Sequence, residues 1–282
     1  MQVRKPEIVG HRGHGSEPEN TMRAFQAGRA HGAERIELDI QSNADGDFVV
    51  IHDPTVERTT NGEGKVRDLT TAQIQALDAG KGERVPLFKD ILEWASQQEV
   101  PLTIEMKHPK KGEEKLLADM VRGAELKDPW VISFKADFVE KFEACAPEVK
   151  TGVLVHERPL FNHAMVGAGV GLVGGLGLAL TAGLSALPFV GVVGAQALAG
   201  AYAGFRLSKS ALQRKDLDRE VDMHIPGRRI LSPKTVKRAQ ERGKEVGVYT
   251  VDDAKKARKF TQWGVDAIIT NYPEKILTAS GK

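Results

Sequence analysis

The sequence predicts an α/β protein of the (β/α)8 TIM-barrel class that carries an apolar helical-hairpin insertion. Short apolar, β-rich runs alternate with stretches at helical spacing over most of the 282 residues, as in parallel α/β folds. Eight of these runs are candidate strands, which is the number that closes this barrel. A doubly wound open sheet is the competing class. No glycine-rich dinucleotide-binding motif follows the first strand, which weakens that alternative.

The expected strands and helices follow from these runs, and residues typical of helix ends mark some of their boundaries. The candidate strands lie at residues 7–10, 35–39, 102–106, 130–134, 151–155, 221–225, 245–251 and 267–270. The candidate helices lie at residues 21–31, 70–77, 90–98, 112–124, 136–146, 233–242 and 253–263. Asn20 is a candidate cap for the first helix, and Gly32 is its expected stop. Ser232 followed by Pro233 is a typical helix start.

The stretch 35–54, RIELDIQSNADGDFVVIHDP, contains the strongest candidate site. Glu37 and Asp39 are two residues apart on an expected strand, so both side chains leave the same face. Residues 48–51 follow a turn cluster, and the connection is too short for a parallel crossover. We therefore expect a hairpin arm that folds back over the strand end and delivers His52.

Side chains at the C-terminal strand ends of a barrel converge on one mouth. The residues expected there are His11 and Arg12, Glu37 and Asp39, His52, and Glu105 with Lys107. Three carboxylates suit a hard cation, Mg²⁺ or Ca²⁺, which takes a phosphate oxygen. Arg12 and Lys107 can offset the remaining phosphate charge. The two histidines can act as general base and general acid. The alternative is that the acid pair is a solvated strand face and the histidines are packing or turn residues.

Several spaced motifs in one order resemble the glycerophosphodiester phosphodiesterases. They are HRG at 11–13, PENT at 18–21, ELD at 37–39, HD at 52–53, RTTNG at 58–62, IEMK at 104–107, YTVD at 249–252 and GVDAIITN at 264–271. The resemblance covers residues 7 to about 155 and about 221 to 273. It implies a metal-dependent barrel hydrolase that releases an alcohol and sn-glycerol 3-phosphate.

The resemblance also implies roles for individual residues. Glu37, Asp39 and Glu105 match the metal carboxylates, while His11 and His52 match the general base and acid. A neighbouring substrate hydroxyl is expected to attack first, through a cyclic phosphate that water opens. Tyr249 stands where family members often carry Trp, so it is a candidate substrate contact, with plain barrel packing as the alternative.

Composition sets further bounds. The net charge of +2 gives no indication of a nucleic-acid partner, and the single cysteine, Cys145, allows no intrachain disulfide. The N-terminus has no leader-like apolar run, so no signal peptide is expected and the default location is intracellular.

Residues 159–205 contain no Asp, Glu, Lys or Arg and are rich in Gly, Ala, Val and Leu. Residues 164–187 and 189–205 could form two helices of about 36 Å and about 26 Å, against a bilayer core of about 30 Å. Glycines at four-residue spacing, as at 167, 171 and 175, allow close helix packing in lipid or between copies of the chain. We therefore expect a discontinuous barrel, 1–158 with 207–282, and a membrane-inserted hairpin at 159–206.

A basic flank follows the hairpin, at Arg206, Lys209, Arg214, Lys215 and Arg219, and favours the cytoplasmic side of the cell membrane. The alternatives for 159–206 are an apolar lid or oligomer interface, or a low-complexity loop. A hairpin at the mouth would turn the site toward lipid, which favours a lysophospholipid substrate cleaved as by a lysophospholipase D. The runner-up is a water-soluble glycerophosphodiester, and a different class is a catalytically idle barrel that serves as a membrane scaffold.

Overall fold

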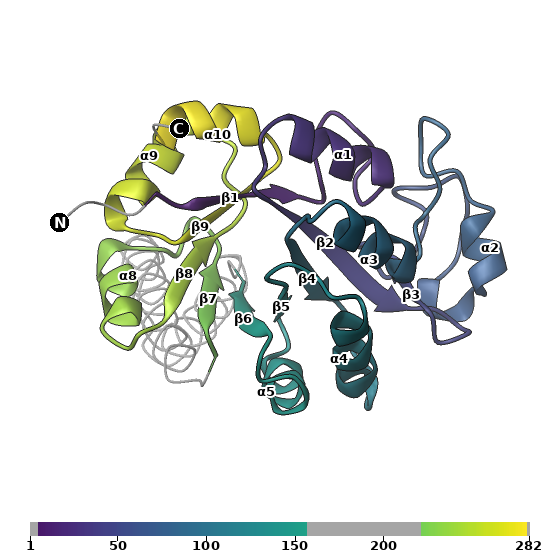
Figure 1. Cartoon of the computed structure of the whole chain (residues 1–282). Coiled ribbons are helices and arrows are strands. Elements are labelled where there is room, and N and C mark those ends of the chain that lie inside the picture. The colour runs from purple at the N-terminus through teal and green to yellow at the C-terminus, as the bar shows by residue number, and fades with distance from the viewer. Residues whose placement is uncertain (1–4, 157–220, 281–282) are drawn as a thin grey trace, which may run out of the picture. The chain divides into compact units, whose positions relative to one another are not determined.

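The computed structural model describes residues 5–156 and 221–280 (Figure 1). Its sheet runs in the order β1-β9-β8-β7-β6-β5-β4-β2-β3, and β1 also pairs with β2. Eight parallel strands therefore close into a barrel, and β3 lies outside the closure as an antiparallel arm on β2. The TIM-barrel prediction and the hairpin arm are both confirmed.

The strands are β1 (Glu7–His11), β2 (Arg35–Ser42), β3 (Phe48–Val50), β4 (Leu102–Met106), β5 (Trp130–Ser133), β6 (Lys150–Val155), β7 (Met223–Pro226), β8 (Glu245–Val248) and β9 (Ala267–Thr270). The helices are α1 (Met22–Ala30), α2 (Thr71–Gln75), α3 (Phe88–Gln97), α4 (Glu113–Gly123), α5 (Ala136–Cys145), α8 (Pro233–Gln240), α9 (Ala254–Trp263) and α10 (Pro273–Ser280), with a 3-10 turn η1 (Val66–Asp68). Every expected strand is present, within three residues at each end.

Two details differ from the sequence prediction. Thr21, and not Asn20, caps α1, because the Thr21 hydroxyl accepts from the Ala24 amide. Asn20 has a left-handed φ of 60°, and its side chain points inward and donates a hydrogen bond to Asp39. Helix α10 was not expected, and it packs against α9 and β1.

The core has two layers, which follow from alternation along the strands. On β2, Ile36, Leu38 and Ile40 face outward and pack with the surrounding helices. The alternate residues face inward: Arg35 is buried and stacks 3.7 Å from the centre of the Trp130 ring, and Glu37 and Asp39 come next along the strand. This alternation carries the acidic pair into the barrel.

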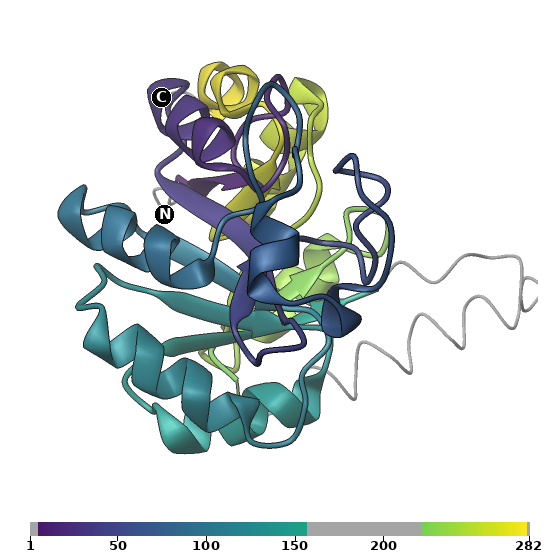
Figure 2. The same cartoon turned by 90° about the vertical axis from the view of Figure 1, so that its right-hand side faces the viewer.

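Residues 55–85 form an excursion from the barrel between β3 and α3, which is seen at the front in Figure 2. It has its own small apolar core, in which Val56, Val66 and Ile74 pack with Val49 and Ile51 of the hairpin arm. The Val56 amide donates to Gly64 and the Val66 amide donates to Pro54, so the excursion is anchored directly beyond His52.

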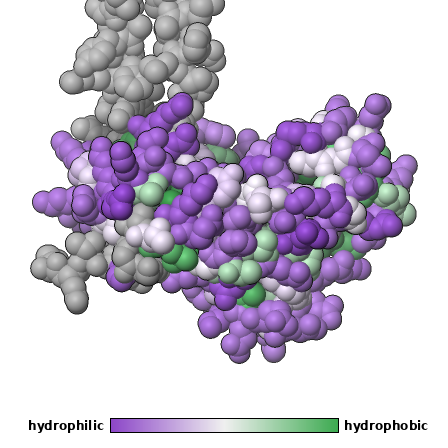
Figure 3. Space-filling view, turned by 90° about the horizontal axis from the view of Figure 1, so that it is seen from above, coloured by the Kyte–Doolittle hydropathy of each residue, from purple (hydrophilic) through white to green (hydrophobic). Residues whose placement is uncertain are grey.

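The predicted insertion at 159–206, with its helical hairpin, lies outside the described residues, and the domain division stays a prediction. Within residues 5–156 and 221–280, no helix is both long and apolar enough to cross a bilayer. Leu116 is the large hydrophobic side chain that is exposed in this part of the chain. Figure 3, which shows the molecule from above, accordingly has mainly hydrophilic side chains on its described surface.

Candidate active site

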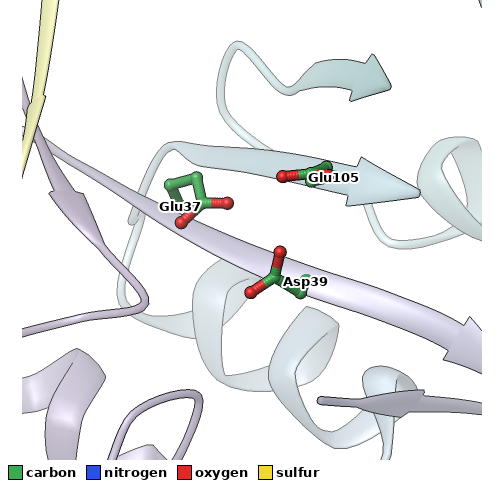
Figure 4. A group of neighbouring side chains, drawn as sticks. All are labelled: Glu37, Asp39 and Glu105. Atoms are coloured by element: carbon green, nitrogen blue, oxygen red, sulfur yellow. The ribbon is translucent and has the colours of Figure 1, made fainter. Parts of the chain in front are cut away.

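Glu37, Asp39 and Glu105 form an acidic triad inside the barrel (Figure 4). β2 supplies the first two and β4 the third, and the register places Asp39 directly beside Glu105. One carboxylate oxygen from each residue lies within 4.8 Å of the others, and all three side chains are buried. The structure therefore brings the three carboxylates together, and their role as metal ligands stays a prediction.

Two cations lie against the triad. Arg12 Nε is 3.1 Å from Asp39 Oδ2, and the Arg12 amide donates to Glu37 Oε2 at 2.9 Å. Lys107 Nζ is 2.7 Å from Glu105 Oε1 and 3.5 Å from Asp39 Oδ1. Arg12 and Lys107, which were predicted to bind phosphate, therefore lie against the carboxylates that were predicted to bind a metal. A phosphate at the metal could be reached by both side chains.

Burial and mutual repulsion shape the charges of the triad. Burial and then Asp39 raise the pKa of Glu105 to about 8, and burial with Asp39 raises that of Glu37 well above its usual range. Burial also acts to raise the pKa of Asp39, but Arg12 and Lys107 outweigh it and lower that pKa. Three ionised carboxylates at this spacing need more positive charge than two side chains supply.

The residues fit a divalent ion of the Mg²⁺ or Ca²⁺ type. Asp39 Oδ1 and Glu105 Oε1 are buried and share one ammonium, Lys107 Nζ, at 3.5 Å and 2.7 Å. Neither contact has hydrogen-bond geometry, so both oxygens can still accept a further ligand. The three donors are all carboxylate oxygens, which hard cations prefer.

His11 is held at the end of β1, opposite Glu37 in the ladder. Its Nδ1 lies 2.8 Å from Asn271 Oδ1. Asn271 is oriented in turn by Asp252, which accepts from both its amide nitrogen and its side-chain Nδ2 at 2.8 Å. Because Nδ2 faces Asp252, the Asn271 oxygen faces His11, so Nδ1 donates and Nε2 carries the lone pair.

His52 follows the hairpin arm, and the Ile51 amide donates to the Asp39 carbonyl at 3.0 Å, which places the arm beside the triad. His52 Nδ1 lies 2.6 Å from Asp53 Oδ1. Arg58 donates to both oxygens of Asp53 and also to Glu19. The two histidines thus differ in their supports: an amide holds His11, and a carboxylate holds His52.

The two pKa values reflect these surroundings. Burial and then Arg12 lower the pKa of His11 to about 4, against the Asn271 hydrogen bond. Burial also lowers the pKa of His52, while Asp39 and Asp53 oppose that shift.

The HRG motif has a steric explanation. Arg12 takes a left-handed φ of 54°, and Gly13 follows at 92°. A Cβ on Gly13 would lie 2.4 Å from the carbonyl carbon and oxygen of Ala24. The tight turn lets the Arg12 amide point at Glu37 while its guanidinium reaches Asp39.

Tyr249 lies elsewhere on the mouth. Its hydroxyl donates to the Val155 carbonyl at 3.0 Å, and its ring meets Phe134 edge-on at 6.0 Å. Lys107 Nζ is 5.5 Å from the centre of the Phe134 ring, so Phe134 lies between Lys107 and Tyr249 and contacts both. Tyr249 therefore has a packing role, and its substrate contact stays a prediction.

Sequence reasoning missed the supporting residues. Asn20 donates to Asp39 Oδ2 at 2.8 Å and accepts from its amide. Asn271 and Asp252 orient His11, and Arg58 supports Asp53. All four lie in the motifs that suggested the family, and a polar residue directly after a strand, as in the run ITN, was the available signal.

Comparison with known proteins gives the same assignment. The profile of the glycerophosphoryl diester phosphodiesterase family matches residues 11–275. A glycerophosphodiester phosphodiesterase of Caldanaerobacter subterraneus is 37% identical over 164 residues, covering 53% of this chain and 67% of that enzyme. One from Bacillus subtilis is 26% identical over 295 residues, covering 94% of this chain and 83% of its own length.

The fold has solved counterparts. The structure of an Oleispira antarctica phosphodiesterase in complex with the product sn-glycerol-3-phosphate superposes with a TM-score of 0.71. It is 21% identical and covers 99% of this chain and 98% of its own, and this likeness concerns the fold. With the family profile spanning nearly the whole barrel, the chain belongs to the glycerophosphoryl diester phosphodiesterase family and is a phosphoric diester hydrolase.

Proposed function

We propose that this enzyme is a divalent-metal-dependent glycerophosphodiester phosphodiesterase that acts at a membrane surface and accepts lysophospholipids as well as deacylated diesters. The observation that carries the metal and the chemistry is the buried triad of Glu37, Asp39 and Glu105, with two neighbouring imidazoles that are each held by a hydrogen bond. Glu37, Asp39 and Glu105 would hold Mg²⁺ or Ca²⁺, which supplies positive charge for a phosphate oxygen.

The hydrogen-bond supports favour His11 as the first base and His52 as the acid. The neutral amide of Asn271 leaves His11 Nε2 as an acceptor, as a base requires. The carboxylate of Asp53 stabilises a protonated His52, as an acid requires. Arg12 and Lys107 offset the charge of the remaining phosphate oxygens.

The proton transfers then follow in two steps. His11 Nε2 takes the proton from the glycerol hydroxyl next to the phosphate, the hydroxyl oxygen bonds to phosphorus, and the bond to the leaving alcohol breaks. His52 gives its proton to the leaving oxygen. Water then opens the cyclic phosphate: His52 takes the proton of the water, and His11 returns its proton to the glycerol oxygen. Both histidines end as they began.

The lipid part of the proposal rests on sequence. The uncharged stretch 159–205 follows the end of a barrel strand, on the mouth side, and its basic flank suits the cytoplasmic side of the cell membrane. Membrane lipid is thus the expected partner of 159–206. The glycines of this stretch would also serve self-association of the hairpin.

The test is turnover by the purified full-length chain in detergent, with Mg²⁺ or Ca²⁺. The substrates are glycerophosphocholine, 1-acyl-lysophosphatidylcholine and diacyl-phosphatidylcholine, with choline release as the common readout. We expect the first two to be cleaved and the third to be inert, because both of its glycerol hydroxyls are acylated and none can attack.

Three outcomes would contradict parts of the proposal. Cleavage confined to glycerophosphocholine rejects the lysophospholipid substrate. Cleavage of the diacyl lipid rejects the internal nucleophile. Unchanged turnover after metal removal with EDTA rejects the metal role of the triad.

A further inference from the structure

A basic cavity lies next to the candidate active site. It has a volume of about 390 Å³, within the range of small-molecule sites. Its lining includes Lys65, Arg67, His108 and Lys110, and among the described residues no carboxylate side chain contributes to it. A neighbouring hollow shares His108 and Lys110 but includes Glu114 and Asp137, so the first cavity is the more selective for an anion.

The cavity borders the residues that carry His52. Pro54, two residues after His52, forms part of its wall, and so does Gln41. Gln41 Nε2 donates to the carbonyls of Ile51 and Asp53, at 3.0 Å and 2.7 Å, on either side of His52. His108 directly follows Lys107. The cavity is therefore on the side of the active site where His52 would protonate the leaving alcohol.

Backbone contacts fix part of the cavity wall, and the basic side chains on it are exposed. An antiparallel bridge pairs Thr55 with Lys65, and the next residue, Val66, is buried in the core of the excursion. Lys65 and Arg67 flank that buried valine, and Lys110 lies four residues after the end of β4. Ser42 also lines the cavity, and among the described residues its buried hydroxyl has no hydrogen-bond partner.

The positive charge is largely uncompensated locally. Arg67 Nε has a loose ion pair with the exposed Asp68 at 3.6 Å, and Lys65 and Lys110 have no ion pair within the described ranges. The pKa of His108 is lowered, by burial first and then by Lys107, Lys135 and His52, in agreement with a positive local potential. Like charges gathered around a concave wall raise the local concentration of anions.

We propose that this cavity is a subsite for the leaving half of the substrate and takes a second anionic group, a phosphate monoester on the leaving alcohol. The proposal rests on the phosphodiesterase function proposed above and specifies its substrate class. Three cations and a hydroxyl line the cavity, and these are groups that bind phosphate oxygens. The preferred substrate then carries one phosphate at the scissile bond and another on the alcohol.

The test compares two substrates that differ by one phosphate, glycerophosphoinositol and glycerophosphoinositol 4-phosphate. Release of sn-glycerol 3-phosphate by the full-length enzyme reports both. We expect kcat/KM to be about 10-fold or more higher for the phosphorylated substrate at low salt, and the difference to shrink as salt is added. Tenfold corresponds to about 1.4 kcal/mol.

The variant combines Lys65→Gln, Arg67→Gln and Lys110→Gln. It should remove the preference for the phosphorylated substrate and leave kcat/KM for glycerophosphoinositol within about twofold, since none of the three residues belongs to the catalytic set. The matched control is Lys255→Gln, Lys256→Gln and Arg258→Gln on α9, where all three residues are exposed. It removes the same charge and should keep the preference.

The outcomes separate the two proposals. Absence of turnover with either substrate counts against the phosphodiesterase function itself. Equal kcat/KM for both substrates in the parent enzyme, or a preference that survives the cavity variant, overturns the subsite. Loss of the preference in the α9 control as well would also overturn the subsite, because it would show that the total charge of the protein causes the preference. If the cavity variant loses only its binding to vesicles with anionic lipid and keeps the preference, the surface docks a membrane and the subsite is rejected.

Discussion

Asn271 is predicted to set the tautomer of His11. Its side chain is held by Asp252, so its oxygen accepts from His11 Nδ1 at 2.8 Å. Replacing Asn271 with Leu keeps a similar volume and removes the acceptor. His11 then no longer has a partner that favours protonation at Nδ1, and part of the population carries the proton on Nε2, where it cannot act as a base.

The magnitude follows from the bond that is lost. A neutral hydrogen bond contributes about 0.5–1.5 kcal/mol net, which corresponds to roughly 2- to 12-fold in a tautomer ratio. We therefore expect Asn271→Leu to lower kcat/KM by about that factor. Loss of the base itself, as in His11→Ala, should cost far more, about 100-fold or greater.

The assay has two readouts and a matched control. One is steady-state kinetics, and the other is the ¹⁵N chemical shifts of the His11 ring nitrogens, which distinguish the two tautomers. Thr270→Val is the control, since it removes another hydrogen bond to Asp252 without touching His11. The reasoning is refuted if the parent enzyme carries the proton on Nε2, or if Asn271→Leu leaves the tautomer unchanged.

Three further predictions concern the metal and the turn. Glu37→Gln should abolish metal-dependent turnover and most of the rise in melting temperature that Mg²⁺ or Ca²⁺ produces, while circular dichroism stays unchanged; full activity would contradict the triad. Gly13→Ala should lower the free energy of unfolding by more than about 2 kcal/mol in chemical denaturation, because the new Cβ would meet the Ala24 backbone. The control is Gly46→Ala, where φ is a similar 87° but the Cβ would meet no other atom; it should lower the free energy of unfolding by only about 1–2 kcal/mol. Equal losses in the two variants would contradict the steric argument. Without metal the pKa of Glu105 is raised to about 8, so the folded chain holds a proton that the unfolded chain releases near pH 4.3. Between these two pH values, the free energy of unfolding of the metal-free protein should therefore fall as pH rises, by up to about 1.4 kcal/mol per pH unit. Metal displaces that proton, so its effect on the melting temperature should grow from pH 5 to pH 8, and an equal effect at every pH would contradict the coupling.

Local patterns in the sequence determined most of the elements and the candidate ligands. Alternation on β2 was enough to place Glu37 and Asp39 on one face, because the two-residue period of a strand is a local property. The short connection after β2 was enough to predict the antiparallel arm that delivers His52. The N-terminus of α1 was misassigned because Asn20 and Thr21 are both good caps, and only the contact with Asp39 distinguishes them.

The tertiary structure decided which distant residues support the site. His11 and Asn271 are 260 positions apart, and they meet because β1 pairs with β9 when the barrel closes. Glu105 reaches Asp39 because the β2–β4 register sets them side by side. No periodicity encodes such pairings, since they depend on strand register and closure summed over the whole core. The sequence by itself therefore determined the chemistry available at the mouth, and the closed barrel decided the partners that orient it.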